Sequence, residues 1–519
     1  MSAHELLRQL SAFSRHSAFP RLKKLVISEF SLVLISDRFL SALAEAHPDL
    51  IELRIDAIEM YDGFEADGMS RLFEGCTRLE DLHLCCPPTW QAHTIPDSID
   101  RLAGLKNLYL EAFNFDLPDS ITSLQSLESL TLRTYRLRRL PQDLGNLTLL
   151  KSLQLESCAV ITSLPTSIHQ LTNLHRLSII ACSRLRLPDI LPDFPALRIL
   201  DIRDCGAISP LPENLGQLQA LETLQVEQVM GLRALTRLPA SSSGLTSLTT
   251  LHLSGVSFSA VSGDIGCWLS RLRTLKVEGG RLTSVPDSLW LAAALQKLHI
   301  KDLPSLASLP DCFGQLTALK TLHLSGLPSL TSLPEGFGQL RALEILHLWR
   351  LEALTHLPES LGQLKNLQEL DMYSCDKLRR LPDSLGRLSS LERLKVNHCP
   401  VLTALPEGMG SGLQSLRELL LNCEKSLPPP FIALLHSIAR NDRDCGSQVL
   451  QRHPARELWR FWNPKEARSK VDAAPVGLPC FNPSPRAHSH QPHGARLPRA
   501  EGAARGDTAT RRVGGTQNP

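Results

Sequence analysis

The stretch "LPESLGQLKNLQELDMYSCDKLRR", residues 357–380, is followed directly by "LPDSLGRLSSLERLKVNHCPVLTA", residues 381–404, with nearly every Leu in the same position. We aligned the whole chain on the Leu that opens the motif L-x-x-L-x-L. The opening residues are Leu22, Leu50, Leu79, Leu105, Leu127, Leu150, Leu174, Leu197, Leu221, Leu248, Leu272, Leu295, Leu319, Leu343, Leu367, Leu391 and Leu416. The chain thus holds about 17 repeats, most regular from Leu295 to Leu391, where each step is 24 residues. They predict a stacked repeat architecture.

Each unit begins with a short predicted strand. In "LQELDM", residues 367–372, apolar and polar residues alternate, which places Leu370 and Met372 on one face of the strand. Glu369, Asp371 and Tyr373 then lie on the opposite face. The first set is expected in the core and the second set on a surface.

The second half of each unit returns the chain to the start of the next strand. In residues 378–391, Pro382 ends strand pairing, Gly386 permits a tight bend, and Leu381, Leu385 and Leu388 point back to the interior. No single unit can bury its Leu side chains alone, so neighbours must stack. We therefore predict an α/β solenoid, shaped as a horseshoe, with a concave parallel sheet and a helical or irregular outer wall.

A further position, eight residues after the opening Leu, is predicted to be buried because it alternates between Cys and aliphatic residues. It is occupied by Cys158, Cys182, Cys205, Cys375 and Cys399, and elsewhere by Val229, Val256, Leu303, Leu327 and Leu351. Cys behaves as a small apolar side chain in such a position. A metal or redox role for these thiols is not expected.

Composition argues against two classes of partner. The chain carries 55 basic and 53 acidic residues, a net charge of +2, so no strong field would draw it to nucleic acid or to anionic lipid. It has no run of 18 apolar residues, and its first 20 residues lack the apolar core of a secretory signal. We predict no nucleic-acid partner, no membrane association and a monomer.

The pattern L-x-x-L-x-L-x-x-C-x-x-L-x-x-L-P-x-x-L-G-x-L, present at residues 367–388, resembles the leucine-rich repeats of plant immune receptors and of type III effectors of plant-pathogenic bacteria. Among the effectors it is most similar to the PopC/HpaF-like group, over residues 22 to about 440. The chain has no GxxxxGK[ST] motif, and Arg is far more frequent than Lys. Both features favour the bacterial effector.

This resemblance implies a function and a location. It implies a leucine-rich-repeat scaffold that binds an unidentified host protein, such as a component of the ubiquitin pathway, and modulates plant defence. The protein would reside in the bacterial cytoplasm before secretion. The type III system would then deliver it into the host cytoplasm or nucleus.

We predict four regions. Residues 1–21 form a capping helix and carry a translocation signal, with Ser2, Ser11, Ser14 and Ser17; residues 22–427 form the solenoid. Residues 428–440 form the C-terminal cap, with apolar residues at helical spacing. Residues 441–519 are a mostly disordered tail, rich in Pro, or the start of a truncated domain.

The resemblance also leaves an enzymatic alternative, because some effectors with such repeats are E3 ubiquitin ligases. One bacterial ligase family uses a Cys-x-Asp nucleophile, and no Cys here has Asp two residues later. The alternative is therefore a ligase of another kind, or the substrate-recognition part of one whose catalytic domain is missing or separate. We predict no catalytic residue, no cofactor and no metal.

The candidate partner site lies on the predicted concave face. Its residues are His299, His323, His347, Asp371 and Lys395 at the middle position of L-x-L, and Lys301, Ser325, Trp349, Tyr373 and Asn397 two positions further on. Trp349 beside Tyr373 places two large aromatic residues where no core requires them, as in a binding hot spot. The three His would stack at about 4.8 Å, a spacing suited to presenting donors to a partner. An ordinary solvated face is the competing interpretation.

Overall fold

The computed structural model describes residues 21–27, 37–56, 66–85, 94–112, 114–187, 194–206, 211–227, 244–256, 269–280, 282–283, 285, 287–402, 405–406 and 409–422. The predicted caps at residues 1–21 and 428–440 lie outside these ranges, apart from residue 21. The predicted tail at residues 441–519 and the column residue Val229 also lie outside them.

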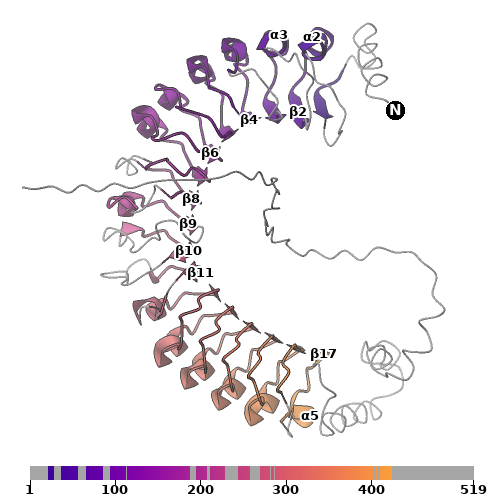
Figure 1. Cartoon of the computed structure of the whole chain (residues 1–519), viewed down its shortest axis with the longest axis vertical. Coiled ribbons are helices and arrows are strands. Elements are labelled where there is room, and N and C mark those ends of the chain that lie inside the picture. The colour runs from indigo at the N-terminus through magenta and orange to yellow at the C-terminus, as the bar shows by residue number, and fades with distance from the viewer. Residues whose placement is uncertain are drawn as a thin grey trace, which may run out of the picture. The chain divides into compact units, whose positions relative to one another are not determined.

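Seventeen strands form one parallel sheet, in which each strand pairs with the next one along the chain. They are β1 (Lys24–Ile27), β2 (Glu52–Asp56), β3 (Asp81–Cys85), β4 (Asn107–Glu111), β5 (Ser129–Arg133), β6 (Ser152–Glu156), β7 (Arg176–Ile180), β8 (Ile199–Arg203), β9 (Thr223–Glu227), β10 (Thr250–Val256), β11 (Thr274–Gly280), β12 (Lys297–Lys301), β13 (Thr321–Ser325), β14 (Ile345–Trp349), β15 (Glu369–Tyr373), β16 (Arg393–Asn397) and β17 (Glu418–Asn422). The strands line the inner side of the repeat region (Figure 1). The predicted solenoid with a concave parallel sheet is confirmed.

Helices lie on the outer side of the repeat region (Figure 1). Among the described residues, three are α-helices: α2 (Asp37–Ala46), α3 (Ala66–Gly75) and the short α5 (Met409–Gly412). The others are single 3₁₀ turns: η1 (Asp97–Arg101), η2 (Asp119–Ser123), η3 (Leu144–Asn146), η4 (Thr166–Gln170), η6 (Leu215–Gln217), η8 (Asp287–Leu291), η9 (Asp311–Gln315), η10 (Glu335–Gln339), η11 (Glu359–Gln363) and η12 (Asp383–Arg387). Within the described ranges, no helix is long and apolar enough to cross a bilayer.

Unit length decides which kind of helix forms the outer wall. The longer first units contain α2 and α3, each of 10 residues. The regular units around Leu367 have room for only five residues of 3₁₀ helix, as in η11. A 3₁₀ turn rises more per residue than an α-helix, so it spans the outer wall with fewer residues.

The core consists of the repeated Leu positions. On β15, Leu370 and Met372 are fully buried, whereas Tyr373 is 42% exposed. Leu385 and Leu388 from the following outer segment are also fully buried. The predicted alternation of core and surface positions is therefore confirmed.

The predicted Cys column is buried where the structure describes its side chains. Cys158, Cys182, Cys205, Cys375, Cys399, Leu303, Leu327 and Leu351 all have no exposed area. The thiols point at backbone carbonyls; the Cys375 Sγ lies 3.4 Å from the Leu348 oxygen. All eight Cys of the described ranges are free thiols. Their repetition reflects packing in a small buried space.

Pro and Gly have separate roles in the outer wall. Pro382 is extended (φ −66°, ψ 145°), and its carbonyl accepts the first hydrogen bond of η12. A Cβ on Gly362 would lie 2.5 Å from the Ser384 oxygen of the next unit, so Gly permits adjacent turns to approach closely. Gly386, where we expected a tight bend, is not among the described residues with positive φ.

A residue with left-handed backbone conformation follows many of the strands. The non-glycine examples are Ser157, Ala181, Asp204, Asp302, Arg350, Ser374 and His398. At this position the backbone N–H still reaches the neighbouring strand: Ser374 donates to the Asn397 carbonyl at 3.0 Å. The next residue, Cys375, then turns into the core. The left-handed residue therefore ends the strand at the same position in each of these units.

The outer core of the C-terminal units contains an aromatic row. Trp290 and Phe313 rings lie 4.9 Å apart, and Phe313 and Phe337 rings are stacked at 5.6 Å. All three side chains are buried. In the next unit the position of Phe337 is taken by Leu361, which is also buried.

We expect Phe337→Ala to lower the free energy of unfolding by about 3–5 kcal/mol, because it leaves a cavity between stacked units. Phe337→Leu is the matched control, since the next unit holds Leu in the same place. It should lower the free energy of unfolding by at most about 1.5 kcal/mol. Urea titration followed by circular dichroism measures both. Equal costs for the two variants would contradict this account of the packing.

Candidate functional site

The sheet register brings the ten predicted site residues together on five adjacent strands, β12 to β16. His299, His323, His347, Asp371 and Lys395 form one row across the strands. Lys301, Ser325, Trp349, Tyr373 and Asn397 form a parallel row beside it. We call these ten residues the concave patch. Their role in binding stays a prediction, although their placement on one surface is established.

Three His of the concave patch form a stack, which we call the histidine ladder (His299, His323 and His347). The rings of His299 and His323 are parallel at 4.3 Å, and His347 meets His323 edge-on at 4.3 Å. The Nδ1 atoms of His323 and His347 are 3.1 Å apart, so one of them carries the proton that joins them. A hydrogen bond therefore joins His323 to His347 within the ladder.

The histidine ladder is half-buried, so its rings are only partly available to present donors to a partner. Burial lowers the pKa of His323 to about 4, and it also lowers the pKa of His299. His252 lies in the same row two strands earlier, and burial lowers its pKa to about 4. These rings are therefore neutral near pH 7. They add no charge to the concave face of the sheet.

Two aromatic side chains are exposed beside the histidine ladder. Trp349 is 37% exposed and Tyr373 is 42% exposed, and they are paired neighbours in the sheet register. The Trp349 indole stacks on His347, with ring centroids 5.1 Å apart and planes 13° apart. Tyr373 contacts His398 edge-on at 5.2 Å. Both aromatics are held in place from one side while the other side faces solvent.

The Lys residues of the concave patch are engaged in ion pairs. Lys301 contacts Glu278, and its pKa is raised chiefly by that hydrogen bond. Lys395 lies 3.4 Å from Glu369 and 3.9 Å from Glu418. The patch consequently has little net charge of its own.

Glu369 belongs to the site, although we did not predict it as a site residue. Its side chain is only 14% exposed, and Arg393 donates two hydrogen bonds to its Oε2 at 2.8 and 3.0 Å. Burial opposes ionisation, but the bonds from Arg393 and Lys395 outweigh it and lower the pKa of Glu369. The period-two alternation had already placed Glu369 on this face. His398, the ring partner of Tyr373, carried no such signal.

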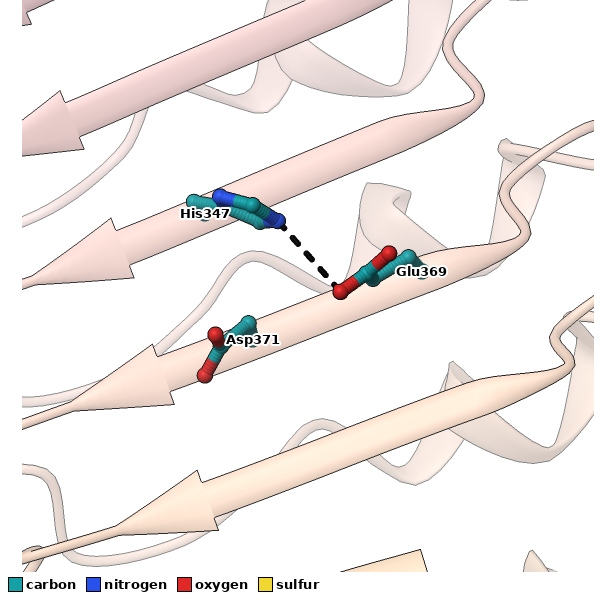
Figure 2. Close-up of side chains that lie close together, drawn as sticks. All are labelled: His347, Glu369 and Asp371. Atoms are coloured by element: carbon teal, nitrogen blue, oxygen red, sulfur yellow. Dashed lines mark ion pairs between the residues drawn. The ribbon is translucent and has the colours of Figure 1, made fainter. Parts of the chain in front are cut away.

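His347, Glu369 and Asp371 converge within the concave patch (Figure 2). Their ligand atoms all lie within 4.8 Å of one another, the one such group of metal-binding side chains among the described residues. Burial raises the pKa of Asp371, although nearby His347 and Lys395 and a hydrogen bond with Trp349 act in the opposite direction. We return to these three residues below.

Comparison with known proteins identifies the fold. No protein-family model matches the sequence, and no curated protein matches it at a significant level. The structure superposes on a leucine-rich-repeat protein of Leptospira interrogans with a TM-score of 0.60, at 24% sequence identity over 79% of this chain and 98% of that one. The chain is a leucine-rich-repeat solenoid.

Other leucine-rich-repeat structures match more loosely. An internalin from Listeria monocytogenes has a TM-score of 0.43 and 19% identity, over 60% of this chain and 86% of that one. The repeat domain of the type III effector XopL has a TM-score of 0.29 and 22% identity, over 52% and 75% of the two chains. These matches concern the repeat and do not bear on function.

We expect the melting temperature of this leucine-rich-repeat protein to fall as the pH is lowered from about 7 to about 5. The unfolded chain has ordinary His residues, with a pKa near 6.5, whereas the pKa of folded His323 is about 4. Between these values the unfolded state binds more protons, so acid favours unfolding. His323→Gln should reduce the fall, as measured by circular dichroism melts at both pH values.

The control for this experiment is His169→Gln, which removes an exposed His of η4 outside the site. It should leave the dependence on pH unchanged. If His323→Gln behaves as the control does, the histidine ladder does not titrate as its burial implies.

Proposed function

We propose that this leucine-rich-repeat chain is a protein-binding scaffold that contacts its partner through the concave patch. The observation that carries the proposal is the exposed pair Trp349 and Tyr373, which are neighbours in the sheet register, with the Trp349 indole stacked on His347. Aromatic residues at the centre of a surface are enriched among those that dominate binding energy. Their rigid support lowers the entropy lost when a partner binds.

The electrostatics of the patch favour one kind of partner surface. His299 and His323 are neutral near pH 7, because burial lowers their pKa values, and Lys301 and Lys395 are paired with Glu278 and Glu369. A partner would therefore meet aromatic faces, a carboxylate at Asp371 and a rim of paired charges. This composition matches a neutral, partly apolar protein surface with a polar rim.

We propose further that the chain is a type III secreted effector of a plant-pathogenic bacterium, of the PopC/HpaF-like kind, and that its partner is a host protein of plant defence. The repeat consensus at residues 367–388 and the Ser-containing first 20 residues support this. Its place of action would be the host cytoplasm or nucleus.

The alternative function is that of an E3 ubiquitin ligase or of its substrate-recognition part, which the resemblance to effectors also implies. Its catalytic residues would lie at positions 441–519 or on a separate polypeptide. An autoubiquitination assay with the purified chain, E1, E2 and ubiquitin separates the two functions. Ubiquitin chains formed by the purified protein would replace the scaffold proposal with the ligase.

We expect Trp349→Ala combined with Tyr373→Ala to reduce capture of the partner from plant leaf extract by about 30-fold or more, because each residue is expected to be a hot spot. Capture by the tagged full chain is quantified by mass spectrometry. The double variant should keep the melting temperature of the wild type, since both side chains are exposed.

The matched control is Tyr135→Ala combined with Leu149→Ala, which removes two side chains exposed by 50% and 48% outside the concave patch. This control should capture the partner as the wild type does. If both double variants lose the same proteins, or neither does, the concave patch is not the binding site.

We expect residues 1–20, fused ahead of a calmodulin-dependent adenylate cyclase reporter, to direct the fusion into plant cells from a bacterium with a working type III system. Cyclic AMP in the leaf tissue reports entry, because the reporter is active only inside the host. An isogenic strain without the secretion apparatus is the control. Equal signals from the two strains, or none from either, would contradict delivery by this segment.

A further inference from the structure

Three side chains on neighbouring strands of the concave patch point their polar atoms at one another. His347 lies on β14, and Glu369 and Asp371 lie two residues apart on β15, on the same face of the sheet. Figure 2 shows the His347 ring reaching toward the Glu369 carboxylate, with the Asp371 carboxylate beside it. The His347 Nε2 is 3.6 Å from the Glu369 Oε1, too long for a hydrogen bond.

Two of these polar atoms are buried and have no hydrogen-bond partner. They are the Nε2 of His347 and the Oδ1 of Asp371. A buried polar atom without a partner is costly, so each one in a native structure calls for an explanation such as an ion or a water molecule. The two unpartnered atoms belong to the same group of three side chains.

The protonation of the histidine ladder makes His347 a suitable ligand. The Nδ1 atoms of His347 and His323 share one proton across 3.1 Å. When His347 donates it, its Nε2 keeps a free lone pair directed at the carboxylates of β15. A His that ligates a metal commonly donates its other ring N–H to a neighbour in this way.

The distances suit a tetrahedral ion. Ligand bonds of about 2.0–2.1 Å place neighbouring ligand atoms about 3.4 Å apart. The Nε2 of His347 and the Oε1 of Glu369 are 3.6 Å apart, and no ligand atom of the three lies beyond 4.8 Å from another. Rotamer adjustments of about 1 Å would close the set. One imidazole nitrogen and two carboxylates are ligands typical of zinc and its neighbours in the first transition row.

We propose that His347, Glu369 and Asp371 form a binding site for a divalent transition-metal ion, with Zn²⁺ as the best match. This site goes beyond protein binding and does not depend on it. It differs from our prediction of no metal site, which considered only the three stacked His. The missing ligands are carboxylates, and they come from one neighbouring strand.

Cations near the site act as competitors of the metal. Arg393 binds the Oε2 of Glu369 and leaves its Oε1 toward His347. Lys395 approaches that Oε1 at 3.4 Å and also reaches Glu418 at 3.9 Å. A bound metal would move Lys395 toward Glu418. Removal of the Lys395 charge should therefore tighten metal binding, an effect that a purely structural cluster would not produce.

The test is isothermal titration of the full chain, stripped with chelator and reduced, with Zn²⁺ alone. All variants carry His488→Ala, His490→Ala and His493→Ala, because that His-rich stretch can bind zinc on its own. We expect Asp371→Asn and His347→Gln each to weaken one site about 10-fold or more. Lys395→Gln should strengthen the same site, and His169→Gln, on η4 outside the concave patch, should change nothing.

Titration with Co²⁺ provides a second readout that distinguishes this site from thiols. Thiolate ligands add an intense near-ultraviolet band to the Co²⁺ spectrum, and nitrogen and oxygen ligands do not. We expect visible bands without the thiolate band, lost in Asp371→Asn. Equal Zn²⁺ affinity in the wild type, Asp371→Asn and His347→Gln, with circular dichroism showing all of them folded, would overturn the proposal.

Discussion

The structure depends on one constraint: no repeat unit can bury its own Leu side chains. Leu370 and Met372 are covered only because the neighbouring units present the same ridge at the same height. Stacking in register is therefore required for stability. Register then decides everything on the other face of the sheet, where residues one unit apart become neighbours at the strand spacing of about 4.8 Å.

The concave patch is a product of this register. Side chains 24 positions apart in sequence, such as His299 and His323, stack as ring neighbours because the leucine faces beneath them are aligned. The same alignment pairs Glu369 with Arg393 on the next strand and leaves little uncompensated charge. Where two adjacent units differ in chemistry, as at β14 and β15, the surface acquires a cluster that neither unit contains alone.

The sequence predicted the features that repeat. The strand faces, the buried Cys column and the exposure of Trp349 and Tyr373 all followed from alternation and unit spacing, because packing forces them. The burial of the histidine ladder and the participation of Glu369 did not follow. These depend on where side chains lean across strands and on which ion pairs form, as between Glu369 and Arg393. Side-chain directions and ion pairs depend on residues that are adjacent in space, and they produce no periodic pattern in the sequence.

The constant register also determines how such a surface can change during evolution. Units such as residues 357–380 and 381–404 have the same length and the same buried positions. Recombination that duplicates or deletes one whole unit would leave the remaining units with core contacts of the same type as before. It would, however, insert or remove the concave side chains of one whole strand. Recognition can thus be altered in discrete steps by unequal crossing-over, whereas a gain or loss of a few residues would misalign the leucine ridges.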